Sequence, residues 1–150
     1  MTGAVEELRP AGAAAAVLAG GALYFLAVFA VGFLLGVART LWLVPRLGER
    51  WSELLEMPVM LVAIYLAARW ISDRFTLRPR PVPVRLATGL VALALLLAAE
   101  LALVLYLRSL TLTEYLETRD PVSGTAYALS LLIFAAMPAL VSRRTDAGDS

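Results

Sequence analysis

A single carboxylate stands inside one of the most apolar stretches of this sequence. Glu100 follows the uncharged run 86–99 and precedes the uncharged run 101–107. An ionised carboxylate is costly in hydrocarbon, so Glu100 must be neutral, paired with a cation or in contact with water. An ionisable residue within a membrane span is by default a candidate for binding or proton transfer. Glu100 is therefore the first candidate functional residue.

One arginine and two further glutamates could meet Glu100. Arg39 is the only charge between residues 11 and 44, and Glu53 and Glu56 follow it in the sequence. If successive helices cross a membrane in alternating directions, all four charges reach a similar depth in its outer half. The sequence predicts a buried cluster of Arg39 with Glu56 and Glu100, supported by Glu53.

This cluster has two interpretations, which the sequence leaves open. It could be a salt bridge that fixes the register of the helices, or a proton-binding or substrate-binding site open to the outside. Glu53 could also be solvated in the outer loop and take no part.

Glycines at helical spacing indicate where the helices pack. Gly32 and Gly36 form a Gly-xxx-Gly pair, which lets another helix approach closely, and Arg39 lies on the same face. Gly89 shares a face with Glu100. We expect these three glycines to point into the bundle.

The elements that carry these residues are predicted from the long apolar runs. Hydrophobic residues make up 61% of the chain and charged residues only 17%. The runs are near or above the roughly 20 residues that a helix needs to cross a bilayer, and they lack the alternation of barrel strands. The sequence predicts an all-α four-helix membrane bundle with up-down topology, a single domain whose spans are 19–43, 54–71, 86–107 and 122–142.

Two of these spans have alternatives. The span 54–71 contains Glu56 and Arg69 and could instead be a re-entrant or interfacial segment. The first span could begin at Ala11 and end at Arg39. A cleaved signal peptide is not expected, because the first apolar run is too long and is preceded by more acidic than basic residues.

The distribution of arginine predicts the orientation. The two terminal segments and the middle loop hold eight of the 13 basic residues, and the positive side is normally cytoplasmic. Both termini should therefore be cytoplasmic. The Arg/Pro segment 78–85 should be a basic loop on that side, with 78–83 stiff and extended, and the tail 145–150 should be disordered.

The composition also excludes several functions. Without Cys or His there is no zinc finger, thiol nucleophile or imidazole base, and we expect no cofactor and no metal. A net charge of +1 without a basic block argues against nucleic acid as a partner.

Two features are expected at the outer surface of the membrane. One is a short interfacial helix within 110–120. The aromatic residues near the outer side favour an interfacial belt over a cation-binding cage: Trp42, Trp51, Tyr106, Tyr115 and Tyr127.

Part of the sequence resembles a type of short, uncharacterised four-span protein of bacterial inner membranes. The likeness is carried by the segments 32–36, 45–48 and 56–58 together with Arg39, Trp42 and Glu53. It covers about the first half of the chain. The resemblance implies the four-span fold and the inner-membrane location, and it carries over no activity.

Three functions are compatible with the sequence. The first is a non-catalytic helical bundle that acts as an accessory or assembly protein. The second is a proton-linked carrier or channel for a small solute, working as a homo-oligomer with Glu100 as the titrating carboxylate. The third is a membrane enzyme acting on lipid with Glu56 or Glu100 as acid or base, which the missing metal ligands and nucleophile–base pair disfavour.

Overall fold

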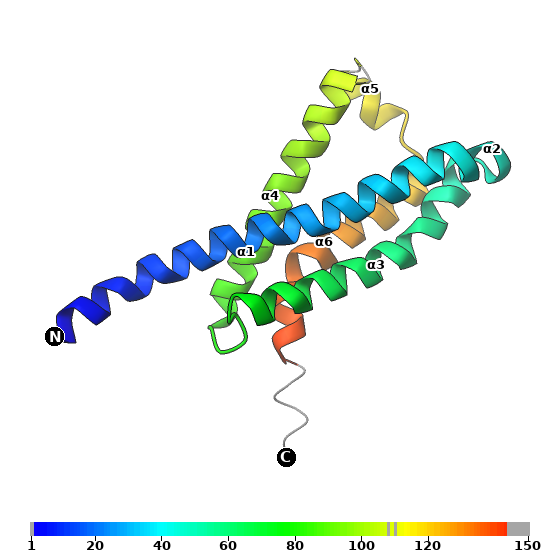
Figure 1. Cartoon of the computed structure of the whole chain (residues 1–150). Helices are drawn as coiled ribbons and strands as arrows, with labels where there is room; N and C mark the ends of the chain where they lie inside the picture. The colour runs from blue at the N-terminus through cyan, green and yellow to red at the C-terminus, as the bar shows by residue number, and fades with distance from the viewer. Residues whose placement is uncertain (1, 108, 110, 144–150) are drawn as a thin grey trace.

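The computed structural model describes residues 2–107, 109 and 111–143, and most of them are helical (Figure 1). The predicted disordered tail 145–150 lies outside these residues. The elements in chain order are α1 (Thr2–Ala38), the π-helical segment η1 (Arg39–Leu43), α2 (Val44–Leu47), α3 (Glu49–Arg74), α4 (Val82–Leu107), α5 (Leu112–Glu117) and α6 (Pro121–Arg143).

In the described part of the chain, four segments are long and apolar enough to cross a membrane, and they alternate in direction (Figure 1). They are Gly12–Leu47, Glu49–Arg74, Val82–Leu107 and Pro121–Val141. The predicted all-α helical bundle is confirmed. Each of these segments extends past its predicted span at one end or both. The short helix expected within 110–120 is α5, which begins with a capping box between Thr111 and Glu114.

The four long helices form a ring in which α1 and α6 each pack against both α3 and α4. Side chains from α1 and α6 meet across the centre of this ring. The buried Tyr24 hydroxyl donates a hydrogen bond to the Phe134 carbonyl oxygen at 2.9 Å, and the two rings stack with centroids 4.5 Å apart. Val28, Ile64 and Ile71 complete this apolar centre.

Glycines set the closest helix approaches. A Cβ atom added to Gly21 of α1 would lie 2.7 Å from Cγ1 of Val91 on α4, and one added to Gly89 would overlap the carbonyl oxygen of Ala135 on α6. From their crossing, α1 and α4 diverge toward the end of the bundle that holds α5 (Figure 1). We call this end, where Gly48 joins α2 to α3, the Gly48 end.

The Gly-xxx-Gly pair of α1 does not behave as one contact surface. A Cβ on Gly32 would lie 3.3 Å from the methyl group of Met60 on α3, whereas one on Gly36 would meet nothing within 4 Å. The expectation of close packing at Gly36 is therefore wrong. The reason is that Gly36 borders a cavity, described below, where the neighbouring helices have separated.

The first hairpin contains two local irregularities. The N–H of Val44 bonds to the carbonyl oxygen of Arg39, five residues back, in the π-helical segment just before Pro45. Gly48 then adopts φ +79°, a conformation that residues with a Cβ rarely adopt, and α3 begins at the next residue. Together they reverse the chain and bring Arg39 close to the start of α3.

The Arg/Pro connection between α3 and α4 is shorter than the sequence predicts. The carbonyl oxygen of Pro81 accepts bonds from the N–H groups of Val84 and Arg85 at 3.0 and 3.3 Å, so the helix has already begun. Residues 82–85 are therefore helical rather than part of the predicted loop. Pro83 is tolerated there because the first helical turn needs no N–H from it. Arg85 is buried.

Candidate functional site

A cavity of about 860 Å³ occupies the Gly48 end of the bundle. Residues of all four long helices line it, together with the segment between α5 and α6. Its wall holds five carboxylates and three guanidinium groups: Glu49, Glu53, Glu56, Glu100 and Asp120, with Arg39, Arg50 and Arg119. The four residues predicted to form a polar cluster all lie on this wall.

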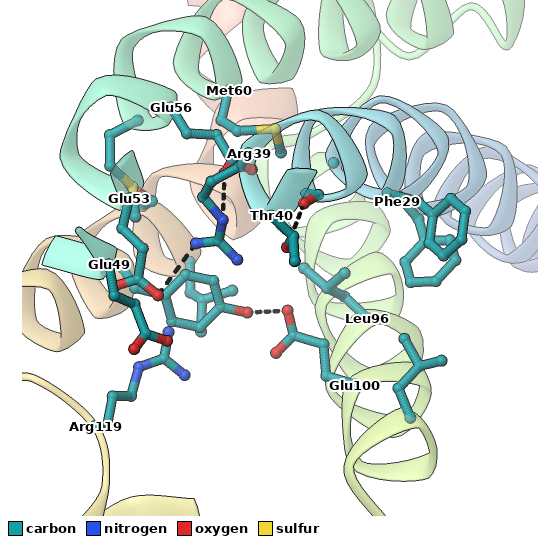
Figure 2. A pocket seen from close by; sticks show the side chains of 18 of the residues that line it. Phe29, Arg39, Thr40, Glu49, Glu53, Glu56, Met60, Leu96, Glu100 and Arg119 are labelled. Carbon is teal, nitrogen blue, oxygen red and sulfur yellow. Dashed lines mark hydrogen bonds and ion pairs between the residues drawn. The ribbon is translucent and has the colours of Figure 1, made fainter. Parts of the chain in front are cut away.

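Arg39 is paired with both glutamates of α3. Its Nη1 atom lies 3.1 Å from Oε1 of Glu53, and its Nε atom lies 3.3 Å from Oε2 of Glu56 (Figure 2). The three side chains are 24%, 16% and 15% exposed, so the group is largely removed from solvent. The π-helical segment and Gly48 make this pairing possible, because they fold the hairpin back at this point. Glu53 is therefore not a solvated loop residue.

Glu100 does not join this group. Its carboxylate accepts a hydrogen bond from the Tyr127 hydroxyl of α6, and among the described residues no arginine forms an ion pair with it (Figure 2). The predicted direct contact between Arg39 and Glu100 is wrong. Because α1 and α4 diverge toward this end, the cavity lies between the two side chains, and both face it.

Arg119 is held by two tyrosines. Its guanidinium carbon lies 4.3 Å from the ring centroid of Tyr127 and 5.5 Å from that of Tyr115, and its Nη1 atom donates to the Tyr115 hydroxyl. The sequence favoured an interfacial belt for these tyrosines, but here both contact a cation, as in a cation-binding cage. Trp42, Trp51 and Tyr106 are exposed.

A further ion pair, of Arg50 with Asp120, lies at the more exposed rim of the cavity. Arg50 of α3 donates from Nε to Oδ1 of Asp120 at 2.9 Å. Asp120 also caps α6, because its Oδ2 accepts from the N–H groups of Val122 and Ser123 at 3.1 and 3.0 Å. The bond from Arg50, with those from Ser123 and Val122, lowers the pKa of the Asp120 carboxyl from 3.8 to about 2. Asp120 is therefore ionised at neutral pH.

Apolar side chains also line the cavity. Phe29 and Phe33 of α1 face this space with their rings 6.4 Å apart, and Leu96 and Leu103 line it from α4. A cavity lined by both charged and hydrocarbon groups suits a ligand that carries both a charge and an apolar part. Among the described residues no group of three acidic side chains is arranged to hold a metal ion.

Sequence reasoning missed Tyr127, Arg119 and Asp120 as members of this site. The spacing of four between Tyr115 and Arg119 is a helical contact spacing and could have indicated their pairing. Nothing in the sequence links Tyr127 to Glu100, because 27 residues separate them and their contact depends on how α4 and α6 pack.

The chain matches none of the protein-family models, curated proteins or solved structures with which it was compared.

Proposed function

We propose that this is a non-catalytic multi-pass protein of the bacterial inner membrane that binds a small amphipathic cation in the cavity at the Gly48 end. The observation that carries this proposal is the charge of the cavity wall, where five carboxylates face three guanidinium groups. If all are ionised, the wall has an excess of two negative charges. A cation that enters such a partly enclosed space lowers its electrostatic energy.

The ion pairs indicate which carboxylate a ligand would meet. Arg39 is engaged by Glu53 and Glu56, and Arg50 is engaged by Asp120. Among the described residues, Glu100 has only the neutral Tyr127 hydroxyl as a hydrogen-bond partner. A ligand cation can therefore contact Glu100 without first breaking an ion pair.

The size and the apolar wall of the cavity suggest the rest of the ligand. A volume of about 860 Å³ is in the range of pockets that hold whole organic molecules. The wall of Phe29, Phe33 and Leu96 would bury a hydrocarbon or aromatic part of the solute. The pairing of Arg39 with α3 then has a structural role, since it holds one side of the cavity in place.

Binding of a matched pair of probes to the purified protein tests this proposal. Benzyltrimethylammonium should bind in calorimetry, whereas benzenesulfonate, of similar size and opposite charge, should not. Glu100→Gln should weaken binding of the cation by about tenfold or more, because it removes the unpaired charge. Glu117→Gln, on α5 and outside the cavity, is the control. Equal binding of cation and anion, or full binding by Glu100→Gln, would refute the proposal.

A second candidate is a proton-linked carrier that works as a homo-oligomer. The free acceptor position of Glu100 on the cavity wall favours it, because a proton and a cation could compete for that carboxylate. In proteoliposomes with an imposed pH gradient, a carrier accumulates benzyltrimethylammonium and moves protons the other way. Uptake should disappear with Glu100→Gln. If benzyltrimethylammonium binds but is not taken up along the pH gradient, the protein is a cation-binding protein and not a carrier.

We also propose that both termini are cytoplasmic and that the Gly48 end faces outward. The arginine distribution supports this orientation. The chain has no cysteine, so single introduced cysteines report their own side of the membrane. In intact cells an impermeant maleimide should label Glu117→Cys and should not label Arg80→Cys. The reverse pattern would invert the topology.

A further inference from the structure

The cation-binding part of the cavity already contains a cation of the chain itself. Arg119 belongs to the segment between α5 and α6, and its guanidinium lies over the Tyr127 ring at 4.3 Å. The same tyrosine donates its hydroxyl hydrogen bond to Glu100. One aromatic side chain therefore contacts both the internal cation and the carboxylate assigned to the ligand.

The contacts of Arg119 are those of a bound ligand rather than those of an ion pair. Its guanidinium contacts two tyrosines, and among the described residues no carboxylate lies within ion-pair distance of it. Its Nε atom is buried and has no hydrogen-bond partner in the described part of the chain. A planar cation is thus held by aromatic faces, with one donor unused.

The side chain of Arg119 also packs against the start of α6. The aliphatic part of Arg119 runs past Gly124 in the first turn of α6, and a Cβ on Gly124 would lie 3.6 Å from both Cγ and Cδ of Arg119. Because Tyr115 is on the short helix α5 and Tyr127 is on α6, the two sides of the site are on different elements. The backbone of 118–120 is held by the bonds of Thr118 to α5 and of Asp120 to α6, so the site can be emptied only by rotation of the Arg119 side chain.

We propose that the Tyr115–Tyr127 site prefers planar organic cations, that is, alkylguanidinium groups, over tetrahedral ammonium groups, and that Arg119 is its resident occupant, which a guanidinium ligand displaces. This inference rests on the proposed function and adds to it the class of cation and the internal competitor. Displacement lets the ligand's positive group take over the contacts with the two rings and approach Glu100. The released Arg119 side chain would turn to the solvated rim.

The test measures whether an external guanidinium replaces the missing side chain. Arg119→Ala should bind butylguanidinium about tenfold more tightly than the unmodified protein does, because the internal competitor is gone. Arg119→Ala should have a lower melting temperature than the unmodified protein. Low millimolar butylguanidinium should restore much of this lost melting temperature. Butylammonium, which has the same charge but is not planar, should do so far less well. Arg46→Ala, an exposed arginine outside the cavity, is the control.

A further variant separates a ligand site from a structural contact. In the double variant Arg119→Ala/Tyr127→Leu, butylguanidinium should no longer raise the melting temperature, because the ring on which it stacks is lost. If Arg119 only stabilises the loop, Arg119→Ala lowers the melting temperature and butylguanidinium does not restore it, which overturns this inference. Benzyltrimethylammonium binding to the unmodified protein would still stand in that case. Loss of all cation binding, in the unmodified protein and in Arg119→Ala, would instead overturn the proposed function.

Discussion

Tyr127 of α6 donates its hydroxyl hydrogen bond to the carboxylate of Glu100 on α4, so the one carboxylate inside the third span is held by a neutral partner. The arginine that the sequence assigned to it, Arg39, is paired with α3 instead. The polar residues at the Gly48 end therefore form two groups on different sides of a cavity. One group joins two helices, and the other leaves a carboxylate available to a ligand.

The first prediction concerns the group that joins α1 to α3. Arg39→Met should lower the free energy of unfolding by about 2–3 kcal/mol, because Glu53 and Glu56 are left close together without a cation. Replacing both glutamates by Gln in the same chain should recover most of this loss. Unfolding by graded detergent denaturation measures it, with Arg46→Met as the exposed control. A triple variant that is less stable than Arg39→Met would contradict a structural role.

The second prediction concerns the separation of the two groups. A double-mutant cycle of Arg39→Met with Glu100→Gln should give a coupling energy below about 0.5 kcal/mol, because the two side chains make no contact. The cycle of Arg39→Met with Glu53→Gln should give about 1 kcal/mol or more. Similar coupling in both cycles would mean that Arg39 and Glu100 interact directly.

The third prediction concerns helix packing. Gly89→Ala should lower the free energy of unfolding by about 2 kcal/mol or more, because the added methyl group overlaps the Ala135 carbonyl and forces α4 and α6 apart. Gly36→Ala is the matched variant. It should be neutral or stabilise the protein by about 0.5–1 kcal/mol, because it adds helix propensity where a Cβ meets nothing within 4 Å. Equal losses in the two variants would show that the packing of α4 on α6 differs from the one described.

The fourth prediction concerns pH. The pKa of Asp120 is lowered from 3.8 to about 2 in the folded chain, chiefly by its bond with Arg50, so its contribution to stability is complete only above the unfolded value. This contribution should be lost progressively as the pH falls from about 4 to about 2. The melting temperature of the protein should exceed that of Asp120→Asn at about pH 5, and the difference should close near pH 2. A difference that is constant across this range would exclude ionisation of Asp120 as its cause.

The sequence was sufficient for the fold class because the signals involved are local and strong. A long apolar run such as 11–38 has few alternatives to a spanning helix, since every backbone polar group in hydrocarbon needs an internal partner. The sequence also identified Glu100 and Arg39 as candidate site residues, because each is a single charge within an apolar stretch. All four predicted polar residues do line one cavity.

The partners of those charges depend on the tertiary structure. Periodicity gives the face of a helix that a residue occupies. The partner on that face depends on where the helices cross and on the angle at which they diverge. In this chain α1 crosses α4 at Gly21, and α4 packs on α6 at Gly89. Beyond the crossing at Gly21, α1 and α4 diverge and leave a gap at the Gly48 end. That gap separates Arg39 from Glu100. The π-helical turn and Gly48 direct Arg39 to α3.

By itself, then, the amino-acid sequence determined a four-helix membrane bundle with ionisable residues near one end, because hydrocarbon allows few other solutions for such runs. Only the tertiary structure decided that Glu100 meets Tyr127 and that Arg119 lies against the same ring. These contacts join residues of separate elements, and their geometry is set by packing at a few glycines rather than by any local preference of the chain.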